Sequence, residues 1–237
     1  MFYLILTAVV VGGATILGAS FGLIFKDCAE RYSRYIVSFA AGIMLAAAIS
    51  GLILPATEVV EGIRLSEVLI GVISGALALY LIEQLFPIKD GDGDKAGAIL
   101  LSLAIAVHNL PEGMAAGVAY GGADIESSLG VIFGIALHNL PEGVIAITPL
   151  IASGVGKGRA MLLAASGAIA EVAGTLIGYM AVSISEAVLP FLLSFAGGTM
   201  LTVIAGEMIP EARGGRRATM VLILGFSLMV LLSSLLG

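Results

Sequence analysis

Twice the sequence reads His-Asn-Leu-Pro-Glu-Gly, as His108-Asn-Leu-Pro-Glu-Gly113 and as His138-Asn-Leu-Pro-Glu-Gly143, each time inside a long apolar run. The two copies contain the only two histidines of the chain. In a helix, the histidine and the glutamate of one copy lie about 40° apart, and the asparagine and the glutamate about 60° apart. One face of each helix therefore offers an imidazole, an amide and a carboxylate together. The proline in each copy cannot donate a backbone hydrogen bond, so it frees the carbonyl four residues earlier and favours a kink.

The composition around these copies is that of a membrane protein. Apolar residues make up 59% of the chain and charged residues 12%, and the mean hydropathy is +1.11. A soluble domain carries about 25% charged residues. Because apolar runs of about 20 residues recur along the whole length, we predict an all-α polytopic membrane protein. The composition does not indicate a nucleic-acid-binding protein, and the single cysteine, Cys28, excludes an intrachain disulfide.

We predict eight transmembrane helices in one bundle, without a separate soluble domain. The first, which is too long for a signal peptide, is expected to be retained. Short loops should make neighbouring helices antiparallel. The predicted spans are approximately 2–25, 34–57, 66–86, 97–120, 127–150, 158–182, 186–209 and 218–236.

The basic residues predict the orientation of these spans. Of the eleven lysines and arginines, only Arg64 lies on the second side of the membrane. The others follow spans 1, 3, 5 and 7: Lys26, Arg31, Arg34, Lys89, Lys95, Lys157, Arg159, Arg213, Arg216 and Arg217. By the positive-inside rule these four loops face the cytoplasm, so both termini are expected outside it, in a protein of the cell (inner) membrane.

The two hexapeptides are expected to meet in the middle of the membrane. His108 comes about 11 residues after its span enters from the cytoplasmic side, and His138 about 11 residues after its span enters from outside. At 1.5 Å per residue each histidine lies about 17 Å deep in a hydrocarbon core of about 30 Å. The copies thus form a local inverted repeat, and transporters commonly build their site at the midplane of such repeats.

Further polar residues lie within or near the predicted spans. Glu171 should share the depth of the hexapeptides, whereas Glu207 and Glu211 lie near the cytoplasmic end of span 7. Buried ionisable residues in a membrane need a partner or a cavity. Glu207 is read equally well as a path residue or as an interfacial acid. For Met44, in the middle of span 2, core packing is the default interpretation.

Taken together, the mid-depth residues predict a site for divalent metal ions. Three carboxylates at one depth, without a basic residue in the spans, would repel one another strongly unless they are protonated, hydrated or neutralised by cations. Imidazole, amide and carboxylate ligands suit zinc, iron, manganese or cobalt. Seven groups exceed one tetrahedral shell, which is consistent with two neighbouring ions. The predicted ligands are His108, Asn109, Glu112, His138, Asn139, Glu142 and Glu171.

On these residues the chain resembles the ZIP (Zrt/Irt-like) divalent metal transporters, especially their short prokaryotic branch. The paired hexapeptides carry the resemblance. Supporting similarities are Phe39-Ala-Ala-Gly-Ile-Met-Leu45 with Leu54-Pro55 in span 2, Glu171 in span 6, and Gly197-Gly-Thr-Met-Leu201 with Glu207-Met-Ile-Pro-Glu211 in span 7.

The resemblance implies a binuclear site whose first ion is held by His108, Glu112, His138 and Glu142, and whose second is held by Asn109, Glu112, Asn139, Glu142 and Glu171. It also implies uptake of zinc, or of iron, manganese, cobalt or cadmium, into the cytoplasm by alternating access, with spans 1, 4, 5 and 6 moving against spans 2, 3, 7 and 8. The metal ion is then the substrate, no organic cofactor is needed, and the protein is a homodimer in the lipid bilayer. Met44 would lie at the outer entrance, and Glu207 on the exit path.

Two other functions compete with transport. An intramembrane metallohydrolase usually places a glutamate next to the first histidine, as in His-Glu-x-x-His, but here asparagine occupies that position. A non-transporting metal sensor would bind metal and move none across a sealed bilayer.

Overall fold

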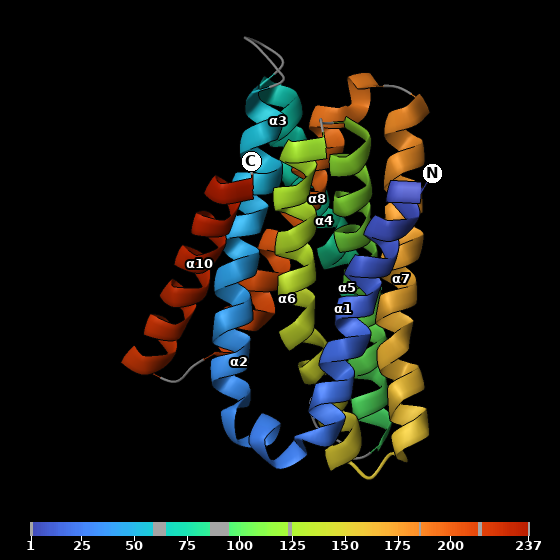
Figure 1. Ribbon diagram of the computed structural model, residues 1–237, viewed down its shortest axis with the longest axis vertical. Helices are drawn as coiled ribbons and strands as arrows, with labels where there is room; N and C mark the ends of the chain where they lie inside the picture. The colour runs from blue at the N-terminus through green and yellow to red at the C-terminus, as the bar shows by residue number, and fades with distance from the viewer. Residues whose placement is uncertain are drawn as a thin grey trace.

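A computed structural model describes residues 2–58, 65–85, 95–122, 125–184, 186–212 and 215–236, and within these ranges all regular secondary structure is helical. Figure 1 shows the helices as one upright bundle. The long helices are α1 (Phe2–Ile24), α2 (Lys26–Ala46), α4 (Leu65–Leu85), α5 (Lys95–Gly122), α6 (Ile125–Ala152), α7 (Lys157–Ile184), α8 (Leu189–Val203) and α10 (Arg216–Leu236). The short elements are η1 (Ala47–Ile53), α3 (Leu54–Glu58), η3 (Glu186–Val188), η4 (Ile204–Met208) and α9 (Ile209–Glu211).

Six helical stretches of the described residues are long and apolar enough to cross a membrane, which makes the chain a polytopic helical membrane protein. They are Tyr3–Ile24, Arg31–Glu58, Ser128–Ala152, Lys157–Ile184, Leu189–Gly206 and Arg216–Leu235. The apolar part of α4, Leu65–Leu81, is shorter. In α5 the side chains before Ala106 lie outside the described residues. Helices continue past the predicted spans at several ends, as in α6, which covers 125–152 where 127–150 was predicted.

Two helices contain a π-helical segment that the sequence analysis did not predict. α2 passes through η1 into α3 without a break, and α8 passes through η4 into α9. Each π segment ends two residues before a proline, Pro55 or Pro210. A proline cannot donate to the carbonyl four residues earlier and crowds it, and a π turn relieves this conflict by lengthening the turn. By contrast, α5 and α6 remain α-helical through Pro111 and Pro141.

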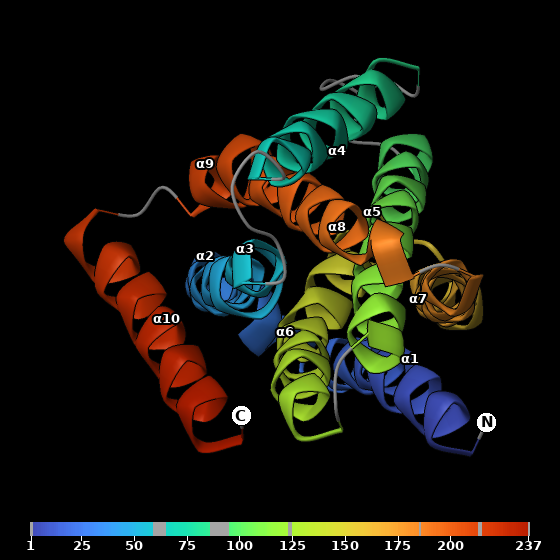
Figure 2. The ribbon, with the colours of Figure 1, turned by 90° about the horizontal axis from the view of Figure 1, so that it is seen from above.

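Glycines bring the helices around the hexapeptides into backbone contact. α5 packs along α7, and α1 packs along α6, as the view from above also shows (Figure 2). A Cβ added at Gly113 would collide with the backbone of Glu171, and one added at Gly143 would collide with the backbone of Thr15. The last residue of each hexapeptide therefore lets its helix approach a neighbour as closely as two backbones can.

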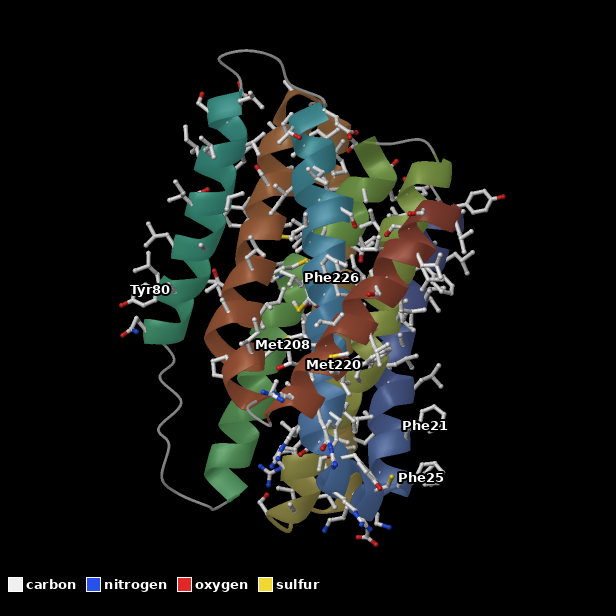
Figure 3. All side chains as sticks on the ribbon, turned by 90° about the vertical axis from the view of Figure 1, so that its left-hand side faces the viewer. Phe21, Phe25, Tyr80, Met208, Met220 and Phe226 are labelled. Atoms are coloured by element: carbon white, nitrogen blue, oxygen red, sulfur yellow. The ribbon has the colours of Figure 1, made fainter. Side chains whose placement is uncertain are left out.

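The outer surface of the bundle is apolar over much of the described part, and the described basic residues gather in one half of the bundle. Phe21, Phe25, Tyr80 and Met220 point outward (Figure 3) and are each more than half exposed. In Figure 1 the connection from α1 to α2 and the connection from α6 to α7 lie at the lower end, and the start of α10 lies in the lower half of the view. These segments carry Lys26, Arg31, Arg34, Lys157, Arg159, Arg216 and Arg217. The first residues of α1 and the last of α10 both lie in the upper half of that view.

Candidate metal centre

Three helices bring most of the predicted ligands together in the interior. α5 carries Asn109 and Glu112, α6 carries the second hexapeptide, and α7 carries Glu171. α5 also packs against α6, and α6 against α7. All six described ligand side chains are buried: Asn109, Glu112, His138, Asn139, Glu142 and Glu171.

Glu112, His138 and Glu142 form the tightest cluster. The imidazole Nε2 of His138 lies 3.2 Å from Oε2 of Glu112 and 2.9 Å from Oε2 of Glu142. One ligand atom from each of the three residues lies within 4.8 Å of the other two. His138 and Glu142 are one helical turn apart on α6, so they share a face, and Glu112 reaches them from α5. Such a cluster of one imidazole and two carboxylates could hold a divalent transition-metal ion.

Glu171 lies beside this cluster and is held by two donors. Asn109 Nδ2 donates to Glu171 Oε1 at 2.5 Å, and the hydroxyl of Thr15 on α1 donates to the same oxygen at 2.7 Å. The other carboxylate oxygen, Oε2, has no hydrogen-bond partner among the described residues. Glu171 thus has one oxygen fixed by the protein and one available to a cation.

The two asparagines are oriented in the same way. The amide nitrogen of Asn109 is bound to Glu171, and that of Asn139 donates to the backbone carbonyl of Val11 on α1 at 3.2 Å. Oδ1 of each asparagine is buried and has no hydrogen-bond partner in the described part of the chain. Since an amide oxygen is a metal ligand and an amide NH₂ is a donor, both side chains present the atom that a cation needs.

The buried acceptors without a partner form one set. Among the described side chains, Asn109 Oδ1, His138 Nδ1, Asn139 Oδ1 and Glu171 Oε2 have no hydrogen-bond partner, and the fifth atom, Glu142 Oε2, has only its 2.9 Å contact with His138 Nε2. A buried acceptor without a donor costs about 1–3 kcal/mol, and more if it is charged. Because all five atoms belong to predicted ligands, a cation would satisfy several of them at once. The donor chemistry therefore fits the metal-binding interpretation of the sequence.

Four predicted residues are not among the buried ligands described above. The side chains of His108, Glu207 and Glu211 are outside the described residues, although the helical backbone includes all three positions. Met44 is 1% exposed and belongs to the main apolar core, together with residues of α5, α6 and α8. Its buried position matches its default interpretation as a core residue.

Thr15 was not predicted from the sequence. Threonines in membrane helices commonly donate to a carbonyl of their own helix, as Thr148 does to Val144. Thr15 is one of several hydroxyl residues in the apolar run of α1, and nothing in its spacing distinguishes it from the others. Its contact with Glu171 depends on how α1 packs against α7.

Comparison with known proteins identifies the family. Residues 89–233 match the family model described as ZIP zinc transporter. The chain belongs to the ZIP family. This is a family of transporters and not of enzymes, and the predicted family resemblance is confirmed.

Several curated relatives match nearly the whole length of this ZIP chain. The zinc transporter GufA of Myxococcus xanthus is 36% identical over 98% of both chains. The zinc transporter ZIPB of Bordetella bronchiseptica is 33% identical over 94% of this chain and 78% of its own length. The zinc transporter ZupT of Shigella dysenteriae is 32% identical over 89% of this chain and 86% of its own.

Proposed function

We propose that this ZIP chain moves divalent transition-metal ions, zinc first among them, across the cell (inner) membrane into the cytoplasm. The observation that carries the proposal is the buried cluster of Glu112, His138 and Glu142, whose ligand atoms lie within 4.8 Å of one another. The names of the relatives supply zinc as the first candidate. Iron, manganese, cobalt and cadmium remain further candidates, because imidazole and carboxylate ligands accept all of them.

The proposed site holds two ions. Glu112, His138 and Glu142, with His108, bind the first. Asn109, Asn139 and Glu171 bind the second, with Glu112 and Glu142 shared between the ions. The free oxygens of Asn109, Asn139 and Glu171 support the second set, because each is buried beside the first cluster without a donor among the described residues.

The proposed topology has eight transmembrane spans with both termini outside the cytoplasm. The described basic residues, which gather in one half of the bundle, support this orientation, since cytoplasmic loops are enriched in lysine and arginine. An even number of crossings agrees with the position of both chain ends in the same half of Figure 1.

Transport is proposed to proceed by alternating access in a homodimer. The strongest packing lies within the two proposed groups: α5 packs on α7 and α1 on α6 in one, and α4 packs on α8 and α2 on α10 in the other, where η1 joins α2 to α8. The groups meet where α2 packs on α6 and α5 packs on α8. A hydrated ion would enter from outside past Met44, lose water at the buried ligands and leave toward Glu207 and Glu211 when the groups shift.

Metal influx into proteoliposomes tests this function. Purified protein is reconstituted with a zinc-responsive dye inside, and influx is compared for the native chain, the double variant Glu112→Gln with Glu142→Gln, and the control Glu58→Gln at an exposed helix end. We expect saturable influx that the double variant loses and the control retains. Metal binding by the native chain without any influx would refute transport and favour the sensor.

A further inference from the structure

The backbone contacts between α5 and α7 at the first hexapeptide are repeated between α6 and α1 at the second. Gly113 of α5 meets the backbone of Glu171 on α7, and Gly143 of α6 meets the backbone of Thr15 on α1. In return, Gly174 of α7 meets the carbonyl of Leu110, and Gly18 of α1 meets the carbonyl of Leu140.

The correspondence extends one turn further in each direction. A Cβ at Gly178 would meet the backbone of Met114, and one at Gly22 would meet the backbone of Val144. On the other side, Gly167 lies against Asn109 Nδ2, and the carbonyl of Val11 accepts from Asn139 Nδ2. In all these pairs the same difference in residue number relates α5 to α6, and a second constant difference relates α7 to α1. By that offset the counterpart of Glu171 is Thr15.

The Thr15 hydroxyl is directed at the site and away from its own helix. Ser20 of α1 donates to the carbonyl of Ile16, four residues earlier, in the usual manner. The corresponding carbonyl for Thr15 is that of Val11, and it accepts from Asn139 instead. Thr15 is 1% exposed, and its hydroxyl donates to Glu171 Oε1 at 2.7 Å. Adjacent turns of α1 thus hold one proposed ligand each.

We propose that Thr15 is a positioning residue for the second cation: it holds Oε1 of Glu171, with Asn109, so that Oε2 faces the ion. This inference rests on the proposed function, because it takes Glu171 as a ligand. At this pair of equivalent positions, α7 carries a carboxylate and α1 carries a hydroxyl. The hydroxyl adds no charge to a site with three buried carboxylates, and it restricts Glu171 to one coordinating oxygen.

Cation binding to the purified full chain tests the role of Thr15. Zinc and cadmium are titrated by calorimetry, and bound metal is counted by mass spectrometry, for the native chain, Thr15→Val, Thr15→Ser and the control Thr7→Val. Thr7 is a buried threonine about two turns earlier on α1. Because partners behind a metal ligand typically contribute 10–100-fold to affinity, we expect Thr15→Val to bind the second cation at least about 10-fold more weakly. Thr15→Val should still bind the first cation with native affinity. Thr15→Ser and Thr7→Val should bind both cations with native affinity.

A double-mutant cycle separates positioning from packing. If Thr15 acts through Glu171, Thr15→Val changes nothing further in a Glu171→Gln background. Effects that multiply in the double variant, or equal losses in Thr15→Val and Thr15→Ser, would overturn the inference. Should Thr15→Val fail to fold, Thr15→Ser and Thr15→Ala make the same comparison, because they differ only by the hydroxyl.

The proposed function and the inference fail differently. A native chain that binds fewer than two cations refutes the binuclear site and the role of Thr15 with it. A native chain that binds two cations, together with a Thr15→Val variant of unchanged affinity, refutes only the role of Thr15.

Discussion

Adding one methyl group at Gly143 should separate α1 from α6 and weaken the whole protein. The new Cβ would lie 2.6 Å from the backbone nitrogen of Ala19 and 3.0 Å from the carbonyl carbon of Gly18, and closer still to the carbonyl oxygen of Thr15. Carbon atoms pack at about 3.5–4.0 Å. All three obstacles are backbone atoms of α1, so no side chain can turn aside, and α1 must move by roughly 1 Å.

The magnitude follows from two opposing effects. Overpacking of a close contact costs about 1–3 kcal/mol, whereas alanine is about 1 kcal/mol better than glycine inside a helix. Gly13→Ala on α1 is the matched control, because its Cβ would meet no heavy atom of the described residues within 4 Å. Helix propensity cancels between the two variants, so Gly143→Ala should be less stable than Gly13→Ala by about 1–3 kcal/mol.

Thermal unfolding of the purified proteins in lipid nanodiscs measures this difference. About 2–4 °C per kcal/mol is typical for a chain of this size, which places Gly143→Ala roughly 2–12 °C below the control. Zinc binding should weaken as well, since moving α1 withdraws Thr15 from Glu171. Unfolding of the two variants within 1 °C of each other would refute the proposed backbone contact between α1 and α6.

Three further outcomes are expected. Cation affinity and uptake should fall as the pH drops from about 7.5 to 5.5, because histidine, with an ordinary pKa of about 6.5, must be neutral to bind metal; a KM that stays constant over this range would contradict histidine ligation. Chelator should lower the unfolding temperature of the native chain, since a cation at 100 times its Kd stabilises the folded protein by about 2.7 kcal/mol. The unfolding temperature of the double variant Glu112→Gln with Glu142→Gln should not change when chelator is added. Met44→Ala should cost about 2–5 kcal/mol of stability as a large-to-small core change and leave the number of bound cations unaltered. A lower number of bound cations in this variant would contradict a core role for Met44, and Met220→Ala on the surface serves as the comparison.

The sequence predicts the helices because its apolar runs are long and its breaks are short and polar. The helices extend past those runs, as α6 does at both ends, because a helix needs only backbone hydrogen bonds to continue through a polar residue. The π segments η1 and η4 escape prediction for a different reason. Each accommodates a proline, but Pro111 and Pro141 lie in uninterrupted α-helix, so proline alone does not determine the local helix type.

The sequence predicts those residues of the candidate site that belong to the repeated motif. His138 and Glu142 are one turn apart in a duplicated motif, and a chain that repeats such a motif at matched depth brings the copies together. Thr15 is 156 residues from Glu171, and nothing in the apolar run of α1 distinguishes its hydroxyl. Only the packing of α1 between α6 and α7 makes it a partner of the site.

The backbone contacts at the hexapeptides also provide a means of sorting distant relatives. A relative that retains histidines and glutamates at the equivalent positions can still fail to bring these ligands together if a larger residue replaces Gly113 or Gly143. Side chains of any size there would hold two helices apart. Sequence surveys that ask for both glycines, and for small residues facing them at Gly18 and Gly174, should therefore separate chains able to assemble this centre from chains that kept only its ligands.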